Sequence, residues 1–379
     1  MSRNHPAPLH RRRYTGCGEV DYGRQVESVN ILIVKLSAIG DVVHTLPSLA
    51  ALRKLYPDAH ITWVIEEASS DLIQDHPYLD RVIVSRRKRW IDELQHGRID
   101  TPLREIKSFI HDLKARPYDL VIDFHGLFKS AMIVSLSSGK RKLGYDSMQE
   151  LSGLFLNEKI PEDMEKHAVD RYLDFPRYLG AYVNEPEFLI PIGEEHRNRV
   201  ERLLLINGIG KQDRFVTVSP VALWDTKLWE DKKFALLCNR ITEELKVRVV
   251  FTGSDRGKLE HVQSMMSVSS INLGGETTLR DLAYAYRLAS LMVTTDSGPM
   301  HIAAAAGTPV VALFGPTDPT RTGPYGKGHT VIRRELSCSP CFLKKCDTMK
   351  CMRDITVEEV FNAVKEKLTE INKGTAKEG

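Results

Sequence analysis

The first half of the chain alternates between short apolar runs and amphipathic segments. Runs rich in apolar and β-branched residues predict buried strands at 29–36, 60–66, 81–85 and 118–124. The intervening segments predict a glycine-bearing loop that leads into a helix over 37–57, and further helices at 68–75, 103–115 and 127–137. Strands that alternate with helices in this way are typical of a parallel, doubly wound sheet.

Periodicity is lost around 186–193, and the same alternation then restarts. We predict strands at 214–218, 247–252, 271–273, 291–295 and 310–314, and helices at about 194–207, 231–245, 255–268, 278–289 and 356–372. We therefore expect an α/β protein with a flexible extension at 1–28, an N-terminal domain at 29–190 and a C-terminal domain at 191–379. Ligands of open α/β sheets bind at the carboxyl ends of the strands, so the cleft between the two domains is where chemistry is expected.

The composition and net charge of the chain exclude some classes of function. The net charge is +3, from 53 basic and 50 acidic residues, which argues against a general nucleic-acid binder. No apolar run approaches the ~20 residues of a membrane span, and Arg11-Arg-Arg13 is not followed by the apolar core of a secretory signal. We therefore expect a cytoplasmic protein.

Four of the six cysteines are close together in the sequence, at Cys338, Cys341, Cys346 and Cys351. A reducing compartment disfavours disulfides. Zinc, an iron–sulfur centre, a structural knot or reduced, packed cysteines all remain open, because the spacing fits no standard metal motif cleanly. We predict no catalytic metal.

The segment 289–317 has the pattern of a strand, a tight turn, a short helix and a second strand. Ser297 or Gly298 can cap the helix, and its free N–H groups and dipole make an anion site at the strand tip. Asp296 there can accept a hydrogen bond from a ribose or an amide, and His301 can donate one to a phosphate. The pattern predicts a nucleotide-diphosphate site, with a purely structural βαβ unit as the alternative.

Asp41 follows the first strand at the start of the next helix. A carboxylate there is stabilised in its ionised form by the helix N-terminus. Gly40 beside it would let a substrate approach the backbone, and His44 lies one turn on. Asp41 is therefore a candidate general base; the alternative is a simple partner of the helix dipole.

The loop after the strand at 214–218 contains Lys227, flanked by Trp224 and Trp229. A cation there could neutralise a departing diphosphate, although a solvated surface lysine is the alternative. Gly253, at the end of the next strand, could let an adenine or a ribose lie close. The chain contains neither GxGxxG nor GxxxxGK[ST], so hydride-transfer and ATPase functions lose their best support.

Basic residues also follow strands of the first half. Arg86 and Arg87 begin one basic run, and Lys129 follows another strand. Such runs are often solvated faces. Their position at strand carboxyl ends instead favours a docking surface for an acidic, phosphorylated or membrane-borne acceptor.

Three segments together resemble the ADP-heptose:lipopolysaccharide heptosyltransferases of glycosyltransferase family 9. They are Ile33-Val-Lys-Leu-Ser-Ala-Ile-Gly-Asp-Val-Val-His-Thr-Leu-Pro47, Thr226-Lys-x-Trp229, and Thr295-Asp-Ser-Gly-Pro-Met-His-Ile-Ala303 with Phe314-Gly-Pro-Thr-Asp-Pro319. The first segment is most like heptosyltransferase I, and the Cys338–Cys351 segment looks more like heptosyltransferase II. Ala222 and Leu223 stand where close relatives tend to have hydroxyl residues ahead of the lysine.

The resemblance implies a GT-B fold, with two Rossmann-like domains facing across a cleft. It implies that Asp41 and Lys227 are catalytic and that the nucleotide-sugar donor is bound by Ser219, Lys227, Gly253, Thr277, Asp296, Ser297, Gly298 and His301. It implies that the acceptor is bound by Ser37, His44, Arg86, Arg87 and Lys129.

The implied reaction is transfer of heptose, with inversion, from ADP-heptose to the Kdo–lipid A inner core of lipopolysaccharide at the inner face of the cytoplasmic membrane. No cofactor or divalent metal, and no nucleic acid, is expected to take part. The alternatives are a heptosyltransferase II-type or other family-9 transferase with a different acceptor, a nucleotide-sugar epimerase on the same fold, and a non-catalytic nucleotide-sugar binding protein.

Overall fold

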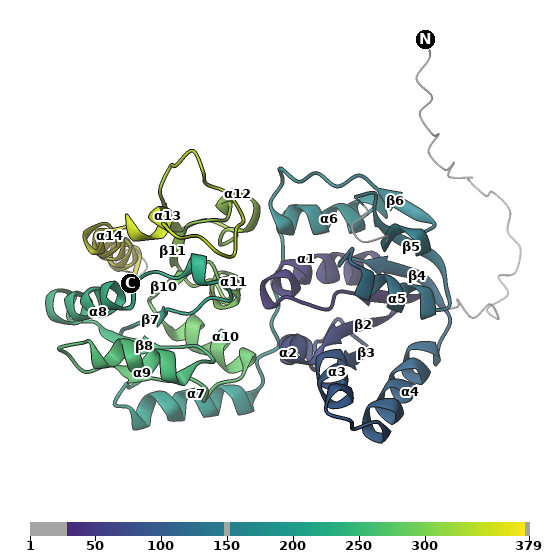
Figure 1. The fold of residues 1–379 in the computed structure, drawn as a ribbon, viewed down its shortest axis with the longest axis horizontal. Coiled ribbons are helices and arrows are strands. Elements are labelled where there is room, and N and C mark those ends of the chain that lie inside the picture. Colours follow the sequence, from purple (N-terminus) through teal and green to yellow (C-terminus); the bar gives the residue numbers. More distant parts are fainter. Residues whose placement is uncertain (1–28, 148–151, 376–379) are drawn as a thin grey trace, which may run out of the picture.

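The computed structural model describes residues 29–147 and 152–375. The predicted extension at 1–28 lies outside the described residues. Two parallel sheets account for the strands of this part of the chain, and Figure 1 shows them in two lobes side by side. The predicted doubly wound architecture is therefore confirmed in both halves.

The first sheet has six strands within the described residues, in the order β3-β2-β1-β4-β5-β6, all paired in parallel. They are β1 (Asn30–Val34), β2 (His60–Glu66), β3 (Arg81–Ser85), β4 (Tyr118–Asp123), β5 (Gly139–Tyr145) and β6 (Glu158–Ile160). The associated helices are α1 (Ile39–Leu55), α2 (Glu67–Ser70), η1 (Asp71–Ile73), α3 (Arg87–Gln95), α4 (Asp100–Lys114), α5 (Phe128–Leu136), η2 (Ser152–Phe155) and α6 (Ala168–Tyr178).

The second sheet has six strands in the described residues, in the order β12-β11-β10-β7-β8-β9, again all parallel. They are β7 (Phe215–Ser219), β8 (Arg248–Phe251), β9 (Ile271–Asn272), β10 (Leu291–Thr295), β11 (Val310–Phe314) and β12 (Thr330–Arg333). The helices are α7 (Glu194–Ile206), η3 (Asp225–Lys227), α8 (Asp231–Leu245), α9 (Arg256–Ser264), α10 (Leu279–Leu288), α11 (Gly298–Ala305), α12 (Pro319–Thr322), α13 (Lys350–Arg353) and α14 (Val357–Thr375).

Both sheets have the same topology. When β7 is counted as the first strand of the second half and that sheet is read from β9, both have the Rossmann strand order 3-2-1-4-5-6. The central strands are mostly apolar, as is typical of strands covered by helices on both faces: Ile31 to Val34 of β1 and Leu291 to Val293 of β10 are fully buried. Burial of one such side chain contributes roughly 1.5–3 kcal/mol.

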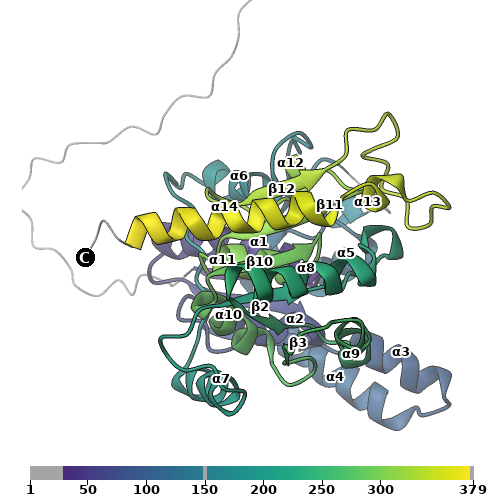
Figure 2. The same ribbon diagram turned by 90° about the vertical axis from the view of Figure 1, so that its left-hand side faces the viewer.

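Residues 179–193 contain no helix or strand and connect the two halves. We propose the domain boundary within this segment, at 190. The C-terminal helix α14 packs on α8, β10 and β11 and so belongs with the second sheet, across which it runs in Figure 2.

The two halves touch through the helices that follow β1 and β10. Helix α1 packs on α11, and the two lie between the sheets in Figure 1. One apolar cluster continues across this contact, from Val43 and Leu46 of α1 to Met300 and Ile302 of α11. At a second contact, the backbone N–H of Arg280 in α10 donates to Asp71 of η1 at 2.9 Å. The starts of α1 and α11 are therefore held against each other.

Candidate active site

Each sheet has one point at which its strand order reverses, between β1 and β4 in the first sheet and between β7 and β10 in the second. Helices leave neighbouring strands toward opposite faces there, which opens a crevice at the carboxyl ends. Asp41 follows β1, and Asp296 follows β10 directly. The two predicted acids therefore lie at the two crevices.

Asp41 is in the first turn of α1. Its Oδ2 accepts a hydrogen bond from the N–H of Ala38 at 3.1 Å, and its Oδ1 accepts one from the Tyr172 hydroxyl at 3.2 Å. Burial raises the pKa of the Asp41 carboxyl, whereas the charge of Lys35 and the N–H of Ala38 lower it, and the net shift is downward. Asp41 is therefore ionised near neutral pH and keeps lone pairs free for a substrate hydroxyl.

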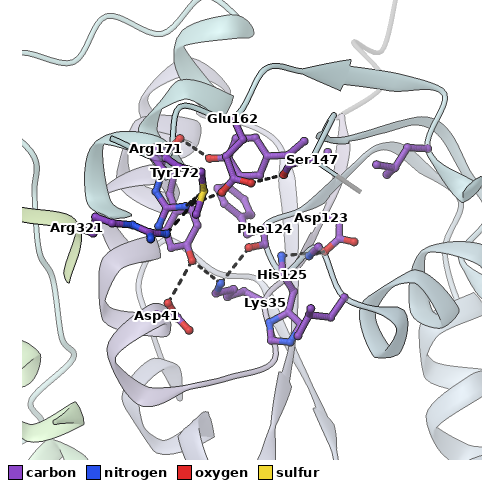
Figure 3. Close-up of a pocket in the computed structure, with 16 residues that line it drawn as sticks. Lys35, Asp41, Asp123, Phe124, His125, Ser147, Glu162, Arg171, Tyr172 and Arg321 are labelled. Carbon is purple, nitrogen blue, oxygen red and sulfur yellow. Dashed lines mark hydrogen bonds and ion pairs between the residues drawn. The ribbon is translucent and has the colours of Figure 1, made fainter. Parts of the chain in front are cut away.

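A cavity of about 250 Å³ opens beside Asp41 at the carboxyl ends of β1, β4 and β5 (Figure 3). Charged and aromatic side chains line it, among them Lys35, Asp41, Asp123, His125, Glu162, Arg171, Tyr172 and Arg321. Arg321 comes from α12 of the second half, and the others come from the first half. Both halves therefore contribute to the cavity.

Two arginines of the cavity have spare hydrogen-bonding capacity. Arg171 Nη1 donates to Glu162 Oε1 at 2.6 Å. The buried Nε atoms of Arg171 and Arg321 have no hydrogen-bond partner among the described residues. An unsatisfied buried donor costs about 1–3 kcal/mol, so an oxygen-rich ligand in this cavity would relieve that penalty.

The second crevice holds an ion pair. Lys227 Nζ lies 2.6 Å from Asp296 Oδ2 and 4.6 Å from the centre of the Trp224 ring. Thr317 Oγ1 donates to the same carboxylate oxygen at 2.7 Å. Asp296 is only 5% exposed, so its contacts fix Lys227 at the carboxyl end of the sheet rather than in solvent. The structure thus brings together two residues that the sequence places 69 positions apart.

Three further predicted donor residues follow or end the strands β7, β8 and β9 of the same sheet. Ser219 ends β7, and its buried Oγ has no hydrogen-bond partner among the described residues. Gly253 follows β8 with a φ of +154°, and a Cβ there would lie 3.1 Å from Val221 Cγ2, so only glycine fits without strain. Thr277 is half-buried in the segment between β9 and α10.

The start of α11 supplies the other predicted donor residues. Ser297 is the N-cap, and its Oγ lies 3.2 Å from Thr294 Oγ1. Gly298 begins the helix, with Pro299 in its first turn. A Cβ at Gly298 would lie 3.0 Å from Ile39 Cβ, so the glycine allows the first turn of α11 to approach α1 closely.

His44 and His301 meet between the two halves. His44 Nε2 lies 2.9 Å from His301 Nδ1, and both rings are buried. A Cβ at Gly40 would overlap the His301 ring, so Gly40 makes room for this histidine. Burial, followed by the neighbouring histidines, lowers the pKa of His44 well below its ordinary value. Burial also lowers the pKa of His301 to about 4, against the charges of Asp296 and Asp41.

Three predicted acceptor residues form one cluster around a buried carboxylate. Lys129 Nζ donates to Ser37 Oγ at 2.8 Å and to Glu66 Oε1 at 3.1 Å. Arg87 Nη2 lies 3.4 Å from the same Glu66 oxygen. The cluster ties the end of β2 to the starts of α3 and α5.

Arg86 is paired separately, with Glu67 at 2.8 Å. Within the described residues, the cavity beside Asp41 is lined by none of the five predicted acceptor residues.

Sequence reasoning missed the basic and phenolic groups that do line it, Lys35, Arg171, Tyr172 and Arg321. Lys35 carried a usable signal, since a lysine inside an apolar strand is unusual. Arg171 and Tyr172 lie on α6, which the sequence analysis did not predict, as it did not predict α3, β5, β6 or β12.

The four clustered cysteines lie in the segment between β12 and α14 and are free thiols. Burial raises the pKa of Cys351, whereas backbone N–H groups near Met349 lower the pKa of the exposed Cys346. Among the described residues, no group of three or more His, Cys, Asp or Glu is arranged to hold a metal ion. A structural role for the cluster stays a prediction.

Residues 106–352, more than half of the chain, match the sequence model of glycosyltransferase family 9 (heptosyltransferase). The chain belongs to glycosyltransferase family 9. Lipopolysaccharide heptosyltransferase 1 of Pseudomonas aeruginosa is 28% identical over 332 residues, which cover 84% of this chain and 87% of that protein.

Two solved structures extend the comparison to the fold. A family-9 glycosyltransferase of Veillonella parvula superimposes with a TM-score of 0.79 at 26% identity, covering 92% of this chain and 99% of that one. Escherichia coli heptosyltransferase WaaC with ADP-2-deoxy-2-fluoro heptose gives a TM-score of 0.71 at 26% identity, covering 89% and 99%. This family-9 glycosyltransferase therefore has the GT-B architecture that its motifs predict.

Proposed function

We propose that this glycosyltransferase moves heptose from ADP-heptose to the Kdo sugar of the lipid A-linked inner core of lipopolysaccharide. The observation that carries the proposal is the arrangement of the two crevices. An ionised acid, Asp41, borders a polar cavity in the first half, and the Lys227–Asp296 pair with the start of α11 lies in the second. The contact between Gly40 and His301 joins the two. The relatives named for lipopolysaccharide heptosyltransfer and for an ADP-heptose analogue support the substrate class.

The proposed mechanism is a single displacement with inversion. Asp41 takes the proton of the acceptor hydroxyl as its oxygen attacks the anomeric carbon. The bond from that carbon to the ADP oxygen breaks, and the electron pair leaves with ADP. Lys227 and the free N–H groups at the start of α11 then stabilise the departing diphosphate. Closure of the two halves would exclude water from the donor.

A defined assay tests this function. The enzyme is incubated with ADP-heptose and synthetic acceptors of lipid A carrying Kdo alone or Kdo already bearing heptose, and the products are weighed by mass spectrometry. We expect the mass of one heptose to be added to the first acceptor. Addition only to the second would favour the heptosyltransferase II-type alternative, and addition to neither would refute heptose transfer to the inner core.

The metal-independence of transfer stays a prediction. Because Lys227 and α11 supply positive electrostatic potential to the diphosphate, we expect turnover to be unchanged after dialysis against EDTA. Loss of turnover that Mg²⁺ or Zn²⁺ restores would show that the protein groups do not suffice.

Peripheral membrane association is part of the same proposal, since the acceptor is a lipid. Among the described helices, none has both the length and the apolar character needed to cross a bilayer. The tip of the α3–α4 hairpin instead exposes aliphatic and basic side chains together. The aliphatic ones are Ile91, Leu94, Ile99 and Leu103. Arg98 and Arg104 are exposed basic residues near the tip, where Asp92 and Asp100 are exposed as well, and Lys88 and Lys107 are exposed further along α3 and α4. Such a surface suits an anionic lipid headgroup layer.

Vesicle flotation tests the docking surface. The wild-type protein should float with vesicles that contain phosphatidylglycerol and should not float with neutral phosphatidylcholine vesicles. The variant I99S/L103S should lose most of this binding, while I206S, which changes an exposed isoleucine of α7 in the other half, should keep it. Equal flotation of both variants would remove the hairpin tip from the proposal.

A further inference from the structure

Lys35 is a charged residue inside the apolar strand region of the first sheet. It is 3% exposed, although its neighbours Val34 and Leu36 are core residues. Its Nζ donates to the carbonyl oxygen of Phe124 at 3.0 Å and to the Tyr172 hydroxyl at 2.7 Å, and it lies 4.4 Å from the centre of the Tyr172 ring. A buried ammonium is retained only where it is well paired, so these contacts indicate a specific role.

Tyr172 connects this lysine to the proposed base. Its oxygen accepts from Lys35, and its proton is therefore directed to Asp41 Oδ1 at 3.2 Å. Lys35 directly follows β1, Tyr172 lies on α6 and Asp41 on α1, and the three side chains meet at the wall of the cavity (Figure 3). Positive charge thus reaches the carboxylate through a hydroxyl rather than through a direct ion pair.

We propose that Lys35 and Tyr172 are positioning residues, which hold the Asp41 carboxylate ionised and fix its orientation toward the acceptor hydroxyl. The inference rests on the proposed function, since it assigns how that base is prepared. The Tyr172 hydroxyl occupies one lone pair of Oδ1, and the N–H of Ala38 occupies one of Oδ2. Two lone pairs of the carboxylate remain for the incoming proton.

The charged and titratable groups that face Asp41 come from four other elements. They are Lys35 directly after β1, Tyr172 of α6, His125 after β4 and His301 of α11. Burial lowers the pKa of His125 to about 3 and that of His301 to about 4, so both rings are neutral above pH 5. Burial lowers the pKa of Lys35 itself, whereas the charges of Asp41 and Asp123 raise it, so the ammonium and the carboxylate support each other. The charge of Lys35 is the largest contribution that lowers the pKa of Asp41.

The test compares Tyr172→Phe and Lys35→Met with wild type. Tyr172→Phe removes a hydrogen bond to the ionised carboxylate, and Lys35→Met removes a nearby positive charge. In both variants the pKa of Asp41 should therefore rise, and the acid limb of the plot of kcat/KM against pH should move to higher pH. We expect kcat at neutral pH to fall about 10-fold in Tyr172→Phe, which corresponds to one charge-assisted hydrogen bond. ADP-heptose affinity by calorimetry should stay unchanged. The double variant should be little slower than the slower single variant, because the two residues act as one unit.

Tyr118→Phe is the matched control. Tyr118 is a buried tyrosine of the same sheet, at the amino end of β4 and away from the cavity. This variant should leave both the rate and the pH profile unchanged. If Lys35→Met fails to fold, Tyr172→Phe and its control decide the question alone. An unmoved acid limb in folded Tyr172→Phe, even with a lower kcat, would overturn the positioning role.

A second readout separates this inference from the proposed function. The Asp41 carboxyl is titrated by carbon-13 NMR of aspartate-labelled protein without substrates, with the signal assigned by its absence in Asp41→Asn. A higher titration midpoint in Tyr172→Phe supports the relay whatever the substrate is, and an unchanged midpoint overturns it. Absence of heptose transfer by the wild type would overturn the function and leave the NMR result standing.

Discussion

The two crevices have the same topology, but the acids Asp41 and Asp296 have different kinds of contact in them. Asp296 is in a direct ion pair with Lys227 at 2.6 Å, so its charge is neutralised by a partner it touches. Asp41 has hydrogen bonds to Ala38 and Tyr172 instead, and the nearest lysine reaches it through the tyrosine. The Asp296 oxygen that contacts Lys227 is thus occupied by an ammonium, whereas the hydrogen bonds to Asp41 leave lone pairs of both of its oxygens open to the cavity.

The same difference explains what each crevice can bind. The first opens into a cavity of about 250 Å³ lined by both acids and bases, which suits a polar sugar. The second places a fixed cation beside the start of α11, where helix N–H groups favour a diphosphate. The proposed base therefore lies in one half and the proposed diphosphate site in the other.

The largest expected effect comes from replacing the two acids one at a time. Asp41→Asn should lower transfer by ~100-fold or more, because the general base is lost, with ADP-heptose affinity by calorimetry nearly unchanged. Asp296→Asn should instead alter donor affinity, since it frees Lys227. Equal loss of turnover in both variants, with donor binding intact in both, would contradict the assignment of Asp41 as the base.

Removal of the cation should produce the next largest effect. Lys227→Met should weaken ADP-heptose binding and slow transfer together, each by roughly 10–100-fold, because the diphosphate loses its main positive charge. The comparison variant is Lys211→Met, which changes an exposed lysine of the same half. Donor titration and single-turnover rates would both have to match wild type for the phosphate role to be rejected.

Gly40→Ala should act on the contact between the two halves. The new methyl group would overlap the His301 ring, and overpacking of this kind costs typically 1–3 kcal/mol. We expect a lower Tm and a reduced kcat without loss of the base itself. Gly257→Ala on α9 meets its nearest atom at 3.6 Å and should be tolerated. A Tm for Gly40→Ala equal to that of wild type would show that the two helices are not closely held.

The smallest expected effect at neutral pH is on stability, because it appears only as the pH falls below 6.5. His301 has a folded pKa of about 4 against an ordinary value of 6.5, so the unfolded chain binds more protons between those values. The stability from the neutral ring is complete above pH 6.5 and is lost as the pH falls to 4, on the order of 3 kcal/mol. Urea unfolding should show a shallower slope in His301→Asn than in wild type, because buried His44 and His125 still contribute to the slope, and His111→Asn should behave as wild type does.

The strand pattern was predictable because each strand is buried on both faces. Residues 60–66, 81–85, 291–295 and 310–314 match β2, β3, β10 and β11 at both ends, since apolar β-branched runs there have no competing interpretation. The missed elements lack that signal. Strand β5, Gly139–Tyr145, begins with exposed basic residues, and α6 contains Pro176, which a sequence pattern takes as a break.

The candidate site divides in a similar way. Asp41, Lys227, Asp296 and His301 lie in the loop or helix that follows a strand, and such a segment of a doubly wound sheet begins at the carboxyl edge whatever the rest of the chain does. The predicted acceptor residues Ser37, Arg87 and Lys129 were placed by the same rule, yet they pair with Glu66 and one another rather than facing the cavity. The position of a residue after a strand predicts at which edge of the sheet it lies, but it does not predict the direction in which its side chain points.

The sequence alone determined the doubly wound architecture, the family and which strand ends carry reactive groups, because these depend on local periodicity and on motifs within short segments. Only the tertiary structure decided which of those groups meet. Lys35, Asp41 and Tyr172 are separated by up to 137 positions, and His44 and His301 by 257. Contacts of that range depend on how α1, α6 and α11 pack, and packing is set by the fit of whole surfaces that no single segment encodes.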